Sequence, residues 1–264
     1  SLILWDSAEP QWKKAIDLDK STVGAASAEV NRRVRLMKQV EAWEWAPAAI
    51  VFIAEHSDKP ERARRFFQAL DRFTFACELA VVENREREGR YANIIKYVSD
   101  EKVLYTGENR QRALLLTEGE QMKFFHTLNR SRRRDRSRRL LLLRLEAAMP
   151  GGRIVRMTDD ATVEHVLPKN GGPWWNERFP DPALRTELAN LLGNLTLLTY
   201  DQNAAADVRP YSEKRKVYFD TNAPILALTK DIAPIEDWSL QAIEERHERL
   251  VRILSEDWGL VRGS

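Results

Sequence analysis

The chain has 264 residues, of which 43% are hydrophobic and 31% charged, and its formal net charge is +2. These proportions are typical of a folded globular protein and exclude an intrinsically disordered chain. No apolar run approaches the roughly 20 residues that span a bilayer, and the N-terminus lacks the pattern of a signal peptide, so no membrane association is expected. The single cysteine, Cys77, excludes an intrachain disulfide and a cysteine-based zinc site and favours the reducing cytosol.

The charge is unevenly distributed along the chain. Residues 1–150 hold 28 Lys and Arg against 22 Asp and Glu, whereas residues 151–264 hold 14 against 18. Seven arginines within ten positions, offset by the single acid Asp135, go round the whole circumference of a helix. This favours contact with phosphate over a merely solvated face, and docking of an acidic partner domain is the alternative. The seven are Arg130, Arg132, Arg133, Arg134, Arg136, Arg138 and Arg139.

The first 150 residues predict a succession of helices. Apolar residues recur at helical spacing from Val30 to Trp43, and Thr117-x-x-Glu120 has the spacing of a capping box. Pro47 and Pro60 stand where the first turn of a helix tolerates proline. The expected helices therefore cover about 30–43, 47–56, 60–83 and 90–99, one that follows Thr117, and one that runs out of the arginine run into Leu140–Leu145.

Pro150-Gly151-Gly152 should end the last of these helices and mark a domain boundary. Beyond it, the β-branched runs Thr162–Leu167 and Leu195–Thr199 predict two strands. Between them we expect a Gly171–Trp175 loop and a helix from Asp181 to Gly193; after them, a helical stretch over 203–219 that breaks at Pro210, and a last helix from Ser239 to Gly259. We therefore predict a mainly helical α+β fold, with a helical region at 1–150 and a compact unit at 151–264.

The pair Glu164-His165 is the sharpest chemical signal in the sequence, and Asn194 and Asn203 follow it nine positions apart. A neutral imidazole accepts a proton near neutral pH, so His165 suits the role of a general base in phosphodiester hydrolysis. Carboxylate and amide oxygens such as those of Glu164 and Asn203 suit a hard divalent cation. Because adjacent strand residues point to opposite faces, the strand should bulge or end at Glu164-His165.

Each of these residues also has a simpler interpretation. His165 could be a structural histidine, Asn194 a turn residue after Gly193, and Asn203 a helix cap. The combination and its spacing favour the chemical interpretation. Asp201 is a further candidate ligand, directly or through water.

The sequence resembles the HNH (His-Me finger) endonucleases, and more narrowly the C-terminal domain of GmrSD-type modification-dependent restriction enzymes. The resemblance covers about residues 140–258. It rests on Glu164-His165-x-x-Pro168, Leu192-Gly193-Asn194-Leu195, Asn203, Tyr211-x-x-Lys214 and Ile243-x-x-Arg246. Many HNH sites have histidine where this chain has Asn203, and asparagine favours Mg²⁺ or Mn²⁺ over a transition metal.

The resemblance implies a ββα-metal unit that cuts DNA with one divalent metal and leaves 5′-phosphate and 3′-hydroxyl ends. In it His165 is the general base, Asn194 orients His165, Glu164 and Asn203 hold the metal, and Lys214 and Lys216 lie near phosphate, whereas Arg246 could be structural and pair with an acid. One such site cuts one strand, so nicking is expected. A role in restriction of foreign or modified DNA in the bacterial cytoplasm is also implied, together with an N-terminal nucleotide-dependent sensor domain that this sequence does not contain. The rival is a helical DNA-binding or partner-docking module whose HNH remnant is inactive, and an RNA nuclease would share the same site.

Overall fold

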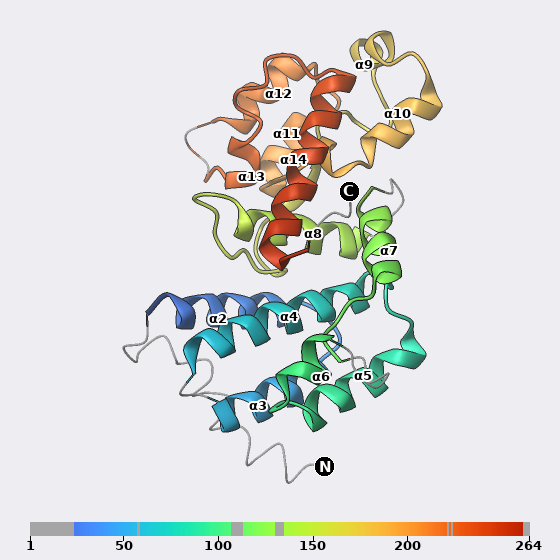
Figure 1. The fold of residues 1–264 in the computed structure, drawn as a ribbon. Coiled ribbons are helices and arrows are strands. Elements are labelled where there is room, and N and C mark those ends of the chain that lie inside the picture. The colour runs from blue at the N-terminus through green and yellow to red at the C-terminus, as the bar shows by residue number, and fades with distance from the viewer. Residues whose placement is uncertain are drawn as a thin grey trace. The chain divides into compact units, whose positions relative to one another are not determined.

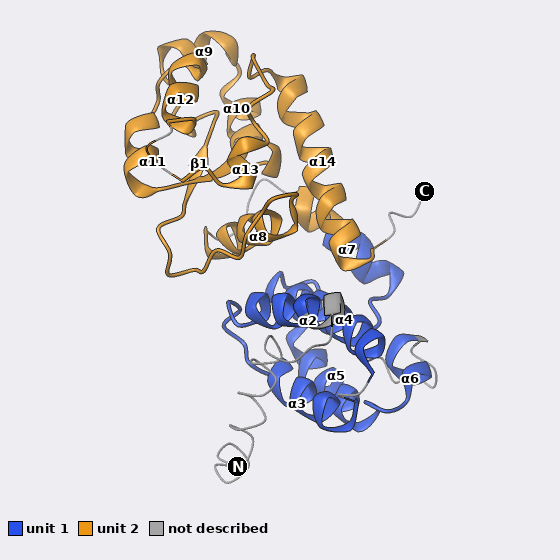
Figure 2. Cartoon of the chain, turned by 90° about the vertical axis from the view of Figure 1, so that its left-hand side faces the viewer, with its two compact units in different colours: residues 1–124 blue, residues 125–264 orange. Residues whose placement is uncertain are grey.

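The computed structural model describes residues 24–56, 59–106, 113–129, 135–220, 222 and 224–260. Over these residues the chain is mainly helical, with one small two-stranded sheet, as expected for an α+β protein (Figure 1). It divides into two compact units, residues 1–124 and 125–264 (Figure 2). None of the described helices combines the length and the apolar character needed to cross a membrane.

The first unit is built from helices around an aromatic core. Helix α2 lies along α4, and α3 packs on both α4 and α5. Phe52 of α3 stacks on Phe66 of α4 with ring centroids 3.9 Å apart. The helices are α2 (Gly24–Met37), α3 (Trp45–His56), α4 (Pro60–Glu78), α5 (Asn84–Lys96), α6 (Glu101–Thr106) and α7 (Glu118–Asn129), the last of which continues into the second unit.

Local capping signals located some of these helices well. Thr117 Oγ1 accepts from the Glu120 amide at 3.2 Å, and Glu120 Oε2 accepts from the Thr117 amide at 2.9 Å, so the predicted capping box is confirmed. The helix expected at 90–99 instead begins at Asn84. Its first turns are polar, so no apolar periodicity in the sequence indicated where it starts. Helix α6 was not expected, since six residues are too few for a periodic pattern.

The second unit contains the sheet and the helices around it. These are α8 (Asp135–Ala148), β1 (Thr162–His165), α9 (Pro173–Arg178), α10 (Pro182–Ala189), the 3₁₀ turn η3 (Leu192–Asn194), β2 (Leu195–Leu198), α11 (Tyr200–Ala206), α12 (Tyr211–Tyr218), α13 (Ala227–Lys230) and α14 (Leu240–Trp258). The predicted Gly171–Trp175 loop is in part helical, because Pro173 begins α9 and Trp175 is buried. The predicted caps of the last helix are confirmed: Ser239 Oγ accepts from the Ala242 amide, and Gly259 ends α14 in the left-handed region.

The structural division falls between residues 124 and 125, whereas the sequence pattern placed a boundary after Pro150. Helix α8 accounts for the difference. Its leucines, Leu140–Leu143 and Leu145, are buried, and the helix packs on both strands, α13 and α14. The helix that looked like the end of the first region therefore belongs to the core of the second.

Strands β1 and β2 pair antiparallel, with Thr162 opposite Leu198 and His165 opposite Leu195. The register is regular from one end to the other. Residues just after β1, and residues of α9, α12 and α14, form one apolar core, and its largest buried side chains include Trp175, Tyr218 and Trp238. This core fixes the end of β1, where the predicted site residues lie.

Gly193 is required where η3 meets α14. A Cβ at this position would lie 2.0 Å from the Ile243 carbonyl oxygen and 2.7 Å from the His247 amide nitrogen, and neither backbone atom can move aside without displacing α14. We expect Gly193→Ala to lower the free energy of unfolding by about 3 kcal/mol, the upper range for overpacking. Urea unfolding measures the loss.

Gly119→Ala provides the matched control. Gly119 is an exposed position of α7, and a Cβ added to it would have no heavy atom within 4 Å. Alanine in a helix is favoured over glycine by about 0.5–1 kcal/mol. A loss in Gly193→Ala no larger than the change in Gly119→Ala would contradict the close approach of η3 and α14.

Candidate functional site

The predicted pair Glu164-His165 forms the last two residues of β1. Glu164 faces Thr196 and His165 faces Leu195 in a regular register, and β1 ends at His165. The strand therefore ends directly after the pair, and it has no bulge there, so both residues still belong to the regular strand. The two side chains leave the strand in different directions.

Glu164 is buried and held by helix α12. Its Oε1 accepts from Lys214 Nζ at 2.6 Å and from the Tyr218 hydroxyl at 2.7 Å. Lys214 also donates to the His165 carbonyl oxygen at 3.0 Å. The second carboxylate oxygen, Oε2, accepts no side-chain hydrogen bond among the described residues.

Burial governs the protonation of this cluster. It raises the pKa of the Glu164 carboxyl, and the ammonium of Lys214 and the Tyr218 hydroxyl oppose that rise. It lowers the pKa of Lys214, which Glu164 opposes in turn. Burial also raises the pKa of the Tyr218 phenol, so its hydroxyl stays protonated and donates to the carboxylate. Two side-chain donors on Oε1, together with a contact from the His165 backbone amide, hold the acid in place.

His165 carries an unsatisfied nitrogen. Its Nε2 is buried and has no hydrogen-bond partner among the residues that the structure describes. Burial lowers the pKa of His165 to about 3, and the nearby cations Lys169 and Arg138 contribute in the same direction. The imidazole is thus neutral at ordinary pH, the form that can accept a proton. An unpaired buried polar atom costs about 1–3 kcal/mol, so such an atom calls for a functional explanation.

Asn203 lies on α11 against β1. Its Nδ2 donates to Thr162 Oγ1 at 2.9 Å and to the Val163 carbonyl oxygen at 3.1 Å. These bonds fix the amide and leave its Oδ1 without a hydrogen bond in the described structure. Thr162 and Glu164 are two residues apart, so their side chains project from the same face of β1. The Asn203 amide binds Thr162 and therefore lies on the face from which Glu164 projects. No group of three or more His, Cys, Asp or Glu side chains suited to a metal occurs among the described residues.

Asn194 is buried and stabilises the backbone beyond His165. Its Oδ1 accepts from the Leu167 amide at 2.7 Å and from Trp238 Nε1 at 2.9 Å. Its Nδ2 donates to the carbonyl oxygens of Leu167 at 2.9 Å and Ala189 at 3.0 Å. All four hydrogen bonds of the amide end on atoms other than the imidazole that it was expected to orient. Asn194 therefore fixes the chain two residues after His165 rather than the ring itself.

The structural interpretation of Arg246 is confirmed. Arg246 is fully buried on α14, and its Nε donates to Asp231 Oδ2 at 2.9 Å. Its Nη1 donates to the carbonyl oxygens of Gly193 at 2.7 Å and Leu195 at 2.8 Å. Arg246 thus secures the turn that delivers Asn194 to β2.

The two lysines expected at phosphate differ in position. Lys214 is 0% exposed and its ammonium is taken up by Glu164 and the His165 carbonyl, so it has no surface to offer to phosphate. Lys216, two residues on, is exposed and lines an open cavity of about 720 Å³ beside α11 and α12. Asp201 lines the same cavity. Glu164, His165 and Asn203 are not among the residues that line it.

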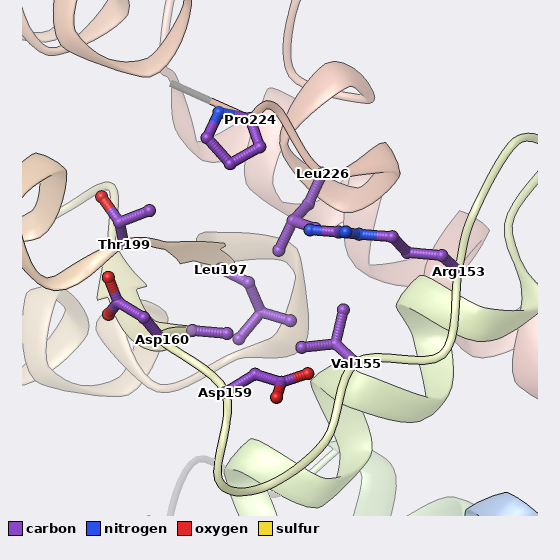
Figure 3. A pocket seen from close by; sticks show the side chains of 9 residues that line it. Arg153, Val155, Asp159, Asp160, Leu197, Thr199, Pro224 and Leu226 are labelled. Carbon is purple, nitrogen blue, oxygen red and sulfur yellow. The ribbon is translucent and has the colours of Figure 1, made fainter. Parts of the chain in front are cut away.

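A smaller cavity of about 200 Å³ lies beside the end of β2. Figure 3 shows the apolar side chains of Val155 and Leu197 between those of Arg153 and Asp160. Asp160 already accepts from the Tyr200 amide at 2.8 Å, and Asp159 bonds Arg156. None of the predicted site residues lines this cavity.

Part of the arginine run lies within the described residues. Arg138 is buried, pairs with Asp135 and donates to Asn190 Oδ1 at 3.1 Å. Arg139 donates to the Asp159 carbonyl oxygen at 2.9 Å, and Arg136 is half-buried. These contacts hold α8 to the second unit. Arg130, Arg132, Arg133 and Arg134 lie outside the described residues.

Sequence reasoning missed two residues that the site depends on. Tyr218 was not singled out, although it lies four residues after Lys214 and therefore on the same face of α12. Trp238 was missed as well, and no local signal connects it to Asn194, which lies 44 residues away.

Comparison with known proteins agrees with the resemblance seen in the sequence. The model of one family, GmrSD restriction endonucleases, C-terminal domain, matches residues 117–253. No curated protein and no solved structure matches the chain. The matched residues make up just over half of the chain and include the whole Glu164 cluster, both asparagines and Arg246. The chain therefore belongs to the family of GmrSD restriction endonuclease C-terminal domains.

Proposed function

We propose that the second unit is an HNH-type endonuclease that nicks DNA with one divalent metal, in the restriction of foreign or modified DNA and hence in defence against phage. His165 takes a proton from the attacking water, and Glu164 and Asn203 hold the metal. Asn194 positions His165 through the backbone of Leu167. By the family resemblance, the products carry 5′-phosphate and 3′-hydroxyl ends.

The observation that carries this proposal is the buried, unpartnered Nε2 of His165 at the end of β1. The large majority of buried side-chain polar atoms have a hydrogen-bond partner. A base that accepts a proton from a bound water keeps it free until substrate arrives.

The oxygen atoms near β1 fit a hard cation. Glu164 Oε2 and Asn203 Oδ1 are each free of a side-chain hydrogen bond, while the partner atoms Oε1 and Nδ2 are fixed. Mg²⁺ and Mn²⁺ accept one or two such protein oxygens and fill the remaining positions with water and phosphate oxygens. Bound there, the metal would stabilise the negative charge that develops on the phosphate.

DNA contact is proposed for the exposed Lys216 and for the arginine run apart from Arg138, which is buried and bonds Asn190. Phosphate contacts made by these side chains would make binding strongly dependent on salt. A nucleotide-dependent sensor domain joined to the N-terminal side, and action in the bacterial cytoplasm, are proposed on the family resemblance. Asp201 remains a proposed further ligand, directly or through water.

A plasmid assay tests the proposal. With Mg²⁺ or Mn²⁺, the protein should convert supercoiled plasmid to open circles, because one site cuts one strand, and EDTA should stop the reaction. Gel electrophoresis separates the two forms, and modified and unmodified plasmids are compared side by side. Salt-dependent DNA binding with no metal-dependent cleavage of either plasmid would instead support the inactive docking module.

A further inference from the structure

Tyr218 is a buried residue of α12 whose hydroxyl contacts Glu164. Its hydroxyl donates to Glu164 Oε1 at 2.7 Å, and Lys214 donates to the same oxygen at 2.6 Å. Both donors are 0% exposed. They stand one helical turn apart, so a single rigid helix face delivers both to one carboxylate oxygen.

From this geometry we propose that Tyr218 is a positioning residue for the metal site: with Lys214 it holds Glu164 Oε1, so that Oε2 alone is presented to the metal. The inference rests on the proposed function of Glu164 as a ligand and extends it to a residue that touches neither metal nor substrate.

The way in which the donors are shared distinguishes this arrangement from an ordinary buried ion pair. A carboxylate buried only for structure gains most when donors satisfy both of its oxygens. Here two donors converge on Oε1. The buried polar atoms without a partner include His165 Nε2 but not Glu164 Oε2, so Oε2 keeps some contact with solvent. The two side-chain donors hold the carboxylate through Oε1, and the His165 backbone amide adds a contact to the same carboxylate.

Lys214 also contacts the residue that carries the proposed general base. Lys214 donates to the His165 carbonyl oxygen at 3.0 Å while it holds Glu164. The ligand and the base-bearing residue are therefore tied to the same helix, and Tyr218 completes the hold on the carboxylate. Hydrogen-bond partners of metal ligands change metal affinity by about 10- to 100-fold when they are removed.

Tyr218→Phe removes the hydroxyl and keeps the ring in the core. We expect it to weaken Mn²⁺ binding about tenfold, measured on DNA-free protein by the EPR signal of free Mn²⁺. The nicking rate should fall at low Mn²⁺ and recover at saturating Mn²⁺, which a loss of folded protein would not produce. Mn²⁺ affinity equal to that of the unmodified protein would overturn the inference.

Tyr211→Phe is the matched control. Tyr211 lies on the same helix, is buried as well, and donates its hydroxyl to the Ile235 carbonyl oxygen at 2.9 Å, away from Glu164. The Tyr211→Phe variant also loses a hydrogen bond that a tyrosine hydroxyl donates, and its Mn²⁺ affinity should be unchanged. An equal loss in both variants would assign the effect to general loosening of α12 and overturn the inference.

Asn203→Ala separates this inference from the proposed function. If Asn203→Ala loses Mn²⁺ affinity while Tyr218→Phe does not, the metal site stands and only the positioning role fails. If neither variant changes Mn²⁺ binding, the proposed metal site itself fails.

Discussion

His165→Ala should reduce metal-dependent nicking of supercoiled plasmid by at least about a hundredfold, the scale of a lost general base. The imidazole is half-buried at the end of β1, and alanine there removes the unpartnered Nε2 without breaking any of the hydrogen bonds that hold β1 to β2. The rate of conversion to open circles, measured at saturating Mn²⁺, reports the loss.

Two controls give this result its meaning. Mn²⁺ affinity should be retained in His165→Ala, because the proposed ligands are Glu164 and Asn203. His126→Ala makes the same change at an exposed position of α7 and should leave nicking unchanged. If His165→Ala nicks at the rate of the unmodified protein, His165 is not the general base. If the variant loses Mn²⁺ binding, His165 is a metal ligand instead of a base.

Local sequence signals predicted the elements that frame the site. The β-branched run at Thr162 gives β1, and Leu195 opens β2, while the caps at Ser239 and Gly259 bound α14. These signals act within a few residues, through backbone preference and side-chain capping, so one sequence suffices to recognise them. The family resemblance, carried by Glu164-His165 and Asn194, was also visible at this level and is confirmed by the family match.

The contacts that give each residue its role could not be predicted in the same way. The pairing of Glu164 with Lys214 joins positions 50 apart, and the bond from Trp238 to Asn194 spans 44. Such contacts are set by how the helices pack on the sheet, which no local pattern encodes. Lys214 illustrates the consequence: a lysine beside a predicted nuclease site suggests phosphate contact, yet packing of α12 turns it into the core.

The same limit applies to the domain boundary. Pro150-Gly151-Gly152 does end α8, as the sequence indicates. Which unit a helix joins depends on what its apolar face covers, however, and the leucines of α8 cover the sheet of the second unit. A helix break is therefore a weaker guide to a unit's limits than the partner of the preceding helix.

Arg246→Met should destabilise the second unit more than any other single change considered for it, by about 3–5 kcal/mol, the range for removal of one partner of a buried ion pair. Arg246 is 0% exposed. Methionine fills much of the volume but leaves the carbonyl oxygens of Gly193, Leu195 and Leu228 without their buried donor. Urea unfolding monitored by circular dichroism measures the loss.

Arg249→Met is the matched control, because Arg249 binds the same acid from a more open position. Its Nη2 lies 2.9 Å from Asp231 Oδ2, and its side chain is 36% exposed, against 0% for Arg246. An ion pair exposed to that extent contributes less than about 1 kcal/mol. If the two variants lose equal stability, Asp231 alone carries the effect. If only Arg246→Met is destabilised, the donors to Gly193 and Leu195 carry it, and the turn that positions Asn194 depends on a residue of α14 some 50 positions away in the chain.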